Sequence, residues 1–240
     1  MRLYLLFCLA PLLTACGSKH DVSINQTYPT GARVKFVHAV VDGPAVNVFA
    51  NDTKLNGTAL TYGTVFPTEY SVIAPGAATL KVSTVASGTV AEATILSAPF
   101  TFESEKYYSV IATGAASGTV ATPSTLVLTD DLNVPDPSKN YIRVLNLVIN
   151  GPAIDLGIGT GDALLTNVAR NTASDYIAVD PNAATAPYSF QVRTTGTRTL
   201  VAPALAFNTL NRGRKITLVV RGAVGRTGAP APTVGSYTVR

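Results

Sequence analysis

The chain of 240 residues has few charged side chains, no tryptophan and a single methionine. Charged residues make up 13% of it, against about 25% in an average soluble domain, and hydrophobic residues make up 47%. A chain disordered along its whole length would show the opposite balance, so general disorder is excluded. No apolar run reaches the roughly 18 residues that a membrane-spanning helix requires.

Cysteine is also scarce, since the chain has only Cys8 and Cys16. Cys8 lies in a segment that we expect to be removed, and Cys16 is expected to carry lipid. The mature chain would then have no free thiol, which excludes an intramolecular disulfide and a cysteine-rich metal site. We expect no metal and no cofactor.

The beginning of the chain has the form of a bacterial lipoprotein signal. It opens with a positive charge, continues with eleven apolar residues at 3–13, and then reads Leu13-Thr14-Ala15-Cys16. The apolar stretch is too short to span a bilayer and is typical of a secretory signal. The small residues Thr14 and Ala15 suit a signal peptidase that cuts between Ala15 and Cys16. The Cys16 thiol would receive a diacylglyceryl group.

The predicted lipid on Cys16 indicates where in the cell we expect the protein. Two or three acyl chains on Cys16, such as palmitate, would anchor the protein stably, because each buried methylene contributes about 0.8 kcal/mol. Gly17 stands where an aspartate commonly retains such proteins at the inner membrane, so we expect the outer membrane of the cell envelope. Residues 1–15 would be the signal peptide, and residues 16–31 the lipidated cysteine and a flexible tether. The alternative is an ordinary secretory signal with a chance cysteine.

Three segments of the first half of the chain recur in the second half. They are 34–48 with 142–156, Glu69-Tyr70 with Asp175-Tyr176, and 106–114 with 214–222, at offsets of 106 to 108 residues. Three matches in the same order predict a duplicated domain, with repeat 1 at 32–132 and repeat 2 at 140–240. Residues 133–139 contain two prolines and suit a short, stiff linker.

Hydrophobic residues alternate with polar ones within each repeat. Val34 and Phe36 flank Lys35, which is typical of a strand with one buried face. The runs at 108–112 and 216–220 do not alternate; they are either central strands covered on both faces or strands located imprecisely. Turn signals such as Asn-Gly, Pro-Gly and Gly-Pro recur about every ten residues. We therefore predict an all-β fold of two tandem antiparallel β-sandwiches, immunoglobulin- or transthyretin-like.

Charge is divided unevenly between the halves. Residues 17–132 carry six Lys or Arg and nine Asp or Glu, whereas residues 133–240 carry eleven and five. The densest basic cluster is Arg212-Gly213-Arg214-Lys215. It predicts either an anionic partner, such as lipopolysaccharide, phospholipid headgroups or an acidic protein face, or a solvated edge that keeps strands from pairing with other chains. A nucleic-acid partner is not expected.

Motifs that carry chemistry are weak in this sequence. Residues 157–161 have the composition of a phosphate loop, but strand-like sequence follows where a helix would be needed, so we interpret them as a hairpin. Glu103 and Glu105 are interpreted as turn residues rather than a carboxylate pair. Asp130 and Asp131 could suggest a cation site, but they stand alone at the end of a predicted strand.

His38 is the one histidine in the predicted repeats, and its counterpart is Asn146. A catalytic histidine needs a nucleophile and an orienting partner, and no such motif accompanies it. We interpret His38 as a structural hydrogen-bonding residue. Four polar residues beside the repeated Gly-Pro turn are expected to cap it, with a ligand role for the loop as the alternative. They are Asp42, Asn47, Asn150 and Asp155.

Residues 32–48 (ARVKFVHAVVDGPAVNV) resemble a family of duplicated bacterial lipoprotein domains of unknown function. The family pattern opens R-V-x-x-x-H-A-x-x-D-x-P-A-V-D-V, and the likeness continues through the segments around Tyr70 and Tyr107. The second repeat departs from the pattern at Asn146, Leu147 and Asn150. The resemblance implies tandem β domains that are secreted or lipid-anchored, and it implies no activity.

Together these features predict a lipid-anchored protein of the cell envelope that acts as a non-catalytic structural or interaction module. Its expected partners are the membrane, through the lipid on Cys16, and a protein or glycan of the envelope. The alternative is a ligand-binding lipoprotein that captures glycan or another cell-wall component. Four tyrosines are the candidates for that role: Tyr62, Tyr70, Tyr107 and Tyr108. An enzyme is not expected.

Overall fold

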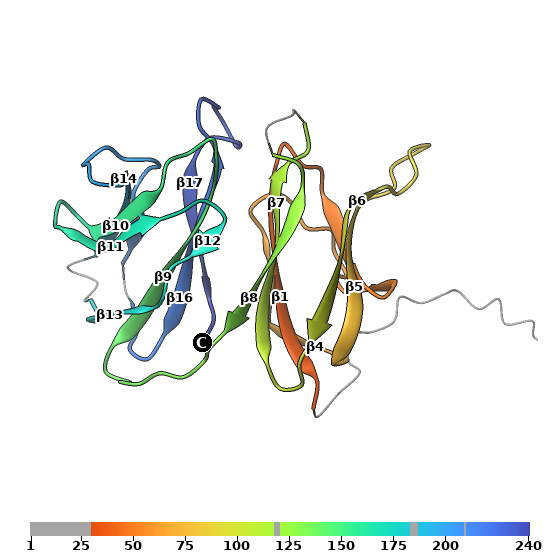
Figure 1. Cartoon of the computed structure of the whole chain (residues 1–240), viewed down its shortest axis with the longest axis horizontal. Helices are drawn as coiled ribbons and strands as arrows, with labels where there is room; N and C mark the ends of the chain where they lie inside the picture. Colours follow the sequence, from red (N-terminus) through yellow and green to blue (C-terminus); the bar gives the residue numbers. More distant parts are fainter. Residues whose placement is uncertain (1–29, 118–120, 183–186, 209) are drawn as a thin grey trace, which may run out of the picture.

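A computed structural model describes residues 30–117, 121–182, 187–208 and 210–240, which form strands and connecting loops (Figure 1). In this described part, no helix is long and apolar enough to cross a membrane. The strands before residue 133 are β1 (Ala32–Val41), β2 (Val46–Ala50), β3 (Thr53–Lys54), β4 (Val65–Ile73), β5 (Gly76–Thr84), β6 (Thr94–Phe102), β7 (Tyr107–Ala115) and β8 (Ser124–Asp130). Those after residue 139 are β9 (Asn140–Ile149), β10 (Ile154–Ile158), β11 (Ala163–Val168), β12 (Thr172–Ala173), β13 (Ile177–Val179), β14 (Tyr188–Thr194), β15 (Leu205–Phe207), β16 (Lys215–Ala223) and β17 (Thr233–Thr238).

The predicted signal peptide at 1–15, Cys16 and most of the predicted tether lie outside the described residues.

Each half of the chain forms two sheets. The strand orders are β4-β1-β7-β8 and β3-β2-β5-β6 in the first half, and β12-β9-β16-β17 and β11-β10-β14-β15 in the second, where β13 also pairs with β9. Among the described strands, no sheet combines members from the two sides of residues 133–139.

The two sheets of each half enclose an apolar core. In the first half, Val34 and Phe36 of β1 pack with Leu80 of β5, and all three are nearly fully buried. In the second half, Ile142 of β9 and Phe190 of β14 are fully buried in the corresponding core. Each large apolar side chain buried in this way contributes about 1.5–3 kcal/mol. The predicted all-β sandwich fold is confirmed.

One strand pair in each half is parallel. Residues 33–41 of β1 pair with 107–115 of β7, and residues 141–149 of β9 pair with 215–223 of β16. Each pair of the second ladder lies 108 residues beyond its counterpart in the first. The prediction of antiparallel sheets holds for the other described pairings. A parallel pair needs a long connection, and the strands of the opposite sheet supply it here.

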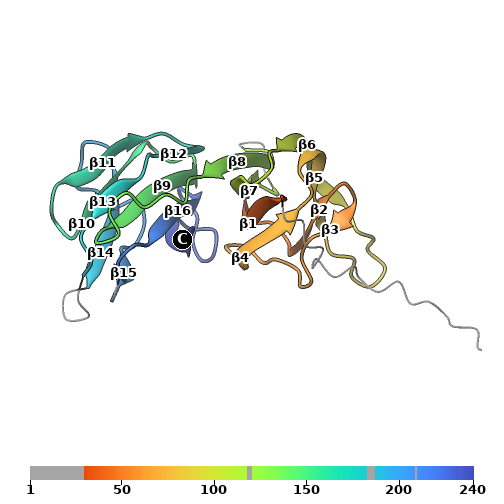
Figure 2. The ribbon, with the colours of Figure 1, turned by 90° about the horizontal axis from the view of Figure 1, so that it is seen from below.

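A third apolar cluster joins the two halves. The inner sheets, which contain β1 and β9, face each other across buried residues from both: Val37, Ala39, Ile111, Leu145, Leu147, Val219, Tyr237 and Val239. Figures 1 and 2 show the resulting four layers, in which the sheets containing β5 and β10 lie outermost. The inner central strands are therefore covered on both faces, which explains why residues 108–112 and 216–220 do not alternate.

The predicted linker, residues 133–139, lies against the second half. The Lys215 ammonium donates to the Asn133 carbonyl at 2.9 Å, and the backbone N–H of Ser138 donates to Asp136 at 2.8 Å. The stiffness expected of this linker stays a prediction. Whether the halves at 32–132 and 140–240 each fold alone stays a prediction, because they bury a common interface.

Candidate functional site

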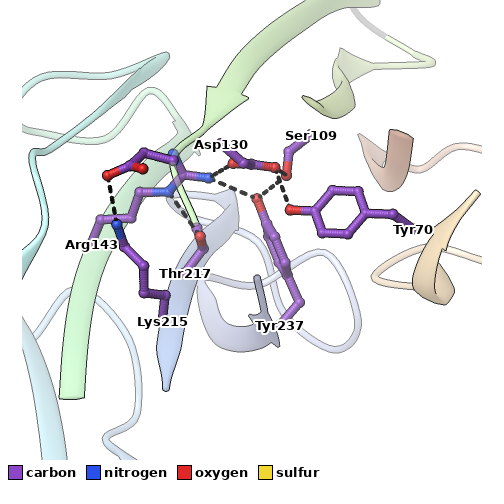
Figure 3. Close-up of polar contacts among 8 residues, drawn as sticks. Tyr70, Ser109, Asp130, Arg143, Lys215, Thr217 and Tyr237 are labelled. Carbon is purple, nitrogen blue, oxygen red and sulfur yellow. Dashed lines mark hydrogen bonds and ion pairs between the residues drawn. The ribbon is translucent and has the colours of Figure 1, made fainter. Parts of the chain in front are cut away.

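A buried ion pair lies where the two inner sheets meet. Asp130 at the end of β8 pairs with Arg143 of β9, and the exposed fractions of the two side chains are 0% and 6%. The Asp130 carboxylate also accepts hydrogen bonds from the Tyr70 hydroxyl at 2.7 Å and the Ser109 hydroxyl at 2.6 Å, as Figure 3 shows. Donors from β4, β7 and β9 converge on one carboxylate, and they offset the cost of removing it from water.

The network continues into the second half of the chain. Arg143 Nε donates to Thr217 Oγ1, its neighbour on β16, at 2.8 Å, and the Tyr237 hydroxyl donates to Ser109 Oγ at 2.8 Å (Figure 3). Burial acts to lower the pKa of Arg143, but Tyr237 and Asp130 raise that pKa above its ordinary value. Arg143 therefore stays charged, and the network ties β7 and β8 to β9, β16 and β17.

A second ion pair extends this network to the linker. Lys215 Nζ lies 3.0 Å from Asp131 Oδ2, and the Lys215 side chain is 3% exposed. The hydrogen bond from the Asn133 backbone N–H, followed by the contact with Lys215, holds the pKa of Asp131 below its usual value. Asp131 and Asp130 thus pair with cations of the protein itself. The predicted basic cluster is divided, because Lys215 points inward whereas Arg212 and Arg214 are exposed.

Cations lie over tyrosine rings at matching places in the two halves. The Lys35 ammonium lies 4.7 Å from the centre of the Tyr70 ring, and the Arg143 guanidinium lies 4.9 Å from that of Tyr176. Such contacts stabilise a partly desolvated cation. Burial, and then the neighbouring Asp130, raise the pKa of Tyr70 far above its ordinary value, so this hydroxyl stays protonated and donates.

An open groove of about 560 Å³ lies beside the network, between the two halves. One wall comes from β4 and from Lys35 of β1. The other comes from β17 and from five residues before it: Phe207, Leu210, Asn211, Arg214 and Ile216. Its charged residues are Lys35, Glu69 and Arg214, and Phe207 is among its apolar ones. Figure 2 shows the C-terminus between β15 and β4, strands that contribute to the opposite walls.

His38 makes the structural hydrogen bonds expected of it. Its Nε2 lies 3.0 Å from the Pro44 carbonyl oxygen, and its Nδ1 accepts from the Val40 N–H at 3.4 Å. Burial lowers the pKa of His38, which favours the neutral ring that this pattern requires. Asn146 has the matching role, since its amide donates to the Pro152 carbonyl at 3.2 Å and accepts from the Val148 N–H at 3.2 Å.

The expected capping of the Gly-Pro turn by four other polar residues is wrong for three of them. Asp42 forms an ion pair with Arg226 at 2.5 Å, and Asn47 accepts a hydrogen bond from Asn56 at 3.3 Å. Asp155 accepts hydrogen bonds from the backbone of residues 167 and 196 and from the Thr195 hydroxyl. These side chains bond to neighbouring loops, and His38 and Asn146 bond to the turn itself because they point inward from β1 and β9.

Asp42 and the fourth residue, Asn150, share a backbone role. Their φ angles are 56° and 55°, in the left-handed region where Asn and Asp are tolerated. Each therefore reverses the chain at the end of a central strand, just before the Gly-Pro turn.

The glycine-rich segment at 157–161 is a hairpin, as interpreted from the sequence. It joins β10 to β11, and the Arg193 guanidinium donates to the carbonyls of Gly159 and Gly161. Arg198 donates to the Gly161 carbonyl as well, at 2.7 Å. The carbonyls of the loop thus face cations.

The carboxylates of Glu103 and Glu105 lie in the exposed turn between β6 and β7. Among the described residues, no group of three or more His, Cys, Asp or Glu is placed to hold a metal ion.

The four candidate tyrosines do not line a common groove. Tyr108 is buried in the first core, where its hydroxyl accepts from a backbone N–H. Tyr70 and Tyr107 contact each other edge to face, with ring centres 4.9 Å apart. Tyr62 lies near His38 instead, with the two ring centres 6.3 Å apart. None of the four borders the groove beside the network, and the tyrosine that does is Tyr237.

The pairing of Asp130 with Arg143 is not predicted by the sequence. A signal was present, because Lys35 and Arg143 occupy matching positions in strands that are otherwise mostly apolar. A buried cation needs an opposite charge or hydrogen-bond acceptors close by. The sequence did not indicate which carboxylate would reach it.

The fold and site define an all-β protein with two packed sandwiches and a polar network between them. The chain belongs to the family described as Domain of unknown function (DUF4397), whose profile matches residues 32–157, just over half of its length. The match continues past the predicted first repeat into β9 and β10. A search of curated proteins finds no match.

Proposed function

We propose that the protein is a lipid-anchored component of the bacterial cell envelope, held at the outer membrane, that acts as a non-catalytic structural or interaction module. The observation that carries the anchor is the sequence Leu13-Thr14-Ala15-Cys16 directly after an apolar stretch. The buried Asp130–Arg143 pair and the apolar cluster between the inner sheets support a rigid body at the end of the tether. A rigid body suits a module that presents a surface to other molecules.

We also infer that this body arose by duplication of one sandwich. The shared register of the two parallel ladders supports the inference, because each pair is displaced by 108 residues. Gly114 and Gly222 support it too, since both have positive φ and both face the backbone of a residue pair ending in proline. His38 and Asn146 bond equivalent backbone groups although their side chains differ.

Metabolic labelling tests the anchor. Cells expressing the full chain are grown with an alkyne analogue of palmitate, and the purified protein is examined by fluorescence and intact mass. The wild type should carry the label and should lack residues 1–15. Cys16→Ser should carry no label and keep its signal segment.

Cys8→Ser is the matched control, because Cys8 leaves with the signal segment in this proposal. It should be labelled and processed as the wild type is. Equal labelling of Cys16→Ser and wild type, or an unmodified Cys16 in native material, would refute the anchor.

A second candidate function is capture of a small ligand such as an envelope glycan. The observation that favours it is the open groove of about 560 Å³ between the halves, which falls in the range of about 300–1,000 Å³ typical of small-molecule sites. Binding of a defined probe in that groove, by the titration described in the next subsection, tests this second function.

A further inference from the structure

The matching cations of the two halves, Lys35 and Arg143, differ in their partners. Arg143 of the second half receives the Asp130 carboxylate from the first half. Lys35 is the residue 108 positions earlier, and it is 3% exposed. Its ammonium donates to the Thr68 carbonyl and lies over the Tyr70 ring. Among the described residues, no carboxylate lies within ion-pair distance of it.

The strand pairing explains this asymmetry. Asp130 lies opposite Tyr107 in the β7–β8 ladder. Lys215 is the counterpart of Tyr107 in the second half. The Val239 N–H donates to the Lys215 carbonyl at 2.8 Å, so Val239 occupies the position opposite Lys215. The second half thus places a valine where the first half places the aspartate. Lys35 has no equivalent of the carboxylate that Arg143 has.

The groove lies next to Lys35, the cation that has no ion-paired carboxylate in the described part of the chain. Lys35 borders it together with Arg214, and Thr68 and Ser236 supply further hydrogen-bonding groups. Glu69 is its one carboxylate among the residues that line it, so its charged groups sum to a positive value. Burial lowers the pKa of Lys35, and the charges of Glu69 and Asp130 act to raise that pKa without cancelling the effect of burial.

We propose that the groove binds a small organic oxyanion, a carboxylate or phosphate on a polar body of about monosaccharide size, through Lys35 and Arg214. The anion would give Lys35 a negatively charged partner, as Asp130 does for Arg143. The aromatic face of Phe207 would contact the less polar side of the ligand. The proposal rests on the second candidate function and does not depend on lipidation, which is measured separately on Cys16.

Isothermal titration calorimetry of the purified full-length mature protein in a non-ionic detergent tests this. The probes are D-glucuronate and D-glucose 6-phosphate, with D-glucose as the neutral match. Either acidic probe should bind at micromolar to millimolar concentrations, and glucose should not. The probe that binds more tightly distinguishes a carboxylate from a phosphate ligand.

Variants locate the binding. Lys35→Met keeps the apolar stem, removes the charge and should weaken binding at least about tenfold, or about 1.4 kcal/mol. Thr238→Asp adds a carboxylate at an exposed position in the groove and should weaken binding similarly while leaving Lys35 in place. Arg212→Gln, an exposed cation that does not line the groove, should bind as the wild type does.

The proposal is overturned if neither acidic probe binds, if glucose binds as well as they do, or if Lys35→Met and Thr238→Asp both leave the affinity unchanged. Equal weakening in Arg212→Gln would also overturn it, because it would indicate attraction to net charge rather than to the groove. Thermal unfolding of each variant shows whether it is folded. If Lys35→Met does not fold, Thr238→Asp still tests binding in the groove.

Discussion

Replacing Asp130 by asparagine should destabilise the protein by about 3–5 kcal/mol, because removing one partner of a buried ion pair leaves the other charge buried and unpaired. The Asp130 side chain is fully buried and that of Arg143 is 6% exposed, so water cannot substitute for the lost carboxylate. Asparagine keeps the shape of the side chain, but its amide carries no charge for Arg143 to pair with. The loss is a large share of the roughly 5–15 kcal/mol that holds a typical protein folded.

Urea unfolding followed by circular dichroism and tyrosine fluorescence measures this change, since the chain has no tryptophan. The matched control is Asp52→Asn, which removes an aspartate paired with Lys81 at 2.8 Å on the surface, where Asp52 is 89% exposed. That change should cost less than about 1 kcal/mol. Both variants replace a carboxylate by an amide, and they differ in whether that carboxylate is buried or exposed.

A double-mutant cycle separates the pair from its surroundings. Asp130→Asn, Arg143→Met and the double variant should show a coupling free energy of about 0.5–3 kcal/mol, with the double variant more stable than the sum of the single losses predicts. The reasoning is refuted if Asp130→Asn costs no more than Asp52→Asn, or if the two single losses simply add.

Two further changes test local features of the fold. Gly114 has a φ of 103° and an added Cβ would overlap a neighbouring backbone carbonyl, so Gly114→Ala should lower the free energy of unfolding by more than about 1 kcal/mol; Gly57→Ala, with open space around it, should change it by no more than that. Comparable urea midpoints for the two variants would contradict this. Because burial lowers the pKa of His38 below its ordinary 6.5, its contribution to stability is complete above that pH and declines as the pH falls below it. His38→Asn, which copies Asn146, should fold and should reduce the acid sensitivity of the urea midpoint between about pH 7 and pH 5; an unchanged pH profile would show that His38 is not the group responsible.

Much of the fold could be predicted from local patterns. The alternation around Lys35 places Val34 and Phe36 on a buried face, and both lie in the first core. The repeat at 108 residues predicts equal architecture in the halves, and the two parallel ladders share that spacing. The parallel pairing itself was not predicted, because period-two patterning reports which face of a strand is buried and carries no information on the direction of its neighbour.

The candidate site could be predicted only in part. The sequence predicts a structural role for His38 because no nucleophile accompanies it, and its ring nitrogens contact backbone atoms of its own turn. The sequence places Asp130 at the end of a predicted strand, and the structure adds that its carboxylate accepts hydrogen bonds from Tyr70, Ser109 and Arg143. These donors come from separate strands, so no local spacing relates them.

The sequence by itself determined the strand content and the similarity of segments in the two halves, because hydrophobic period and residue type act over a few neighbouring positions. Only the tertiary structure decided that the two sandwiches pack face to face, that Asp130 reaches Arg143, and that Lys35 is buried at the border of a groove, with no carboxylate of the described residues within ion-pair distance of it. The physical reason is that a run of apolar residues specifies that a face must be covered, whereas the surface that covers it depends on contacts between residues far apart in the chain.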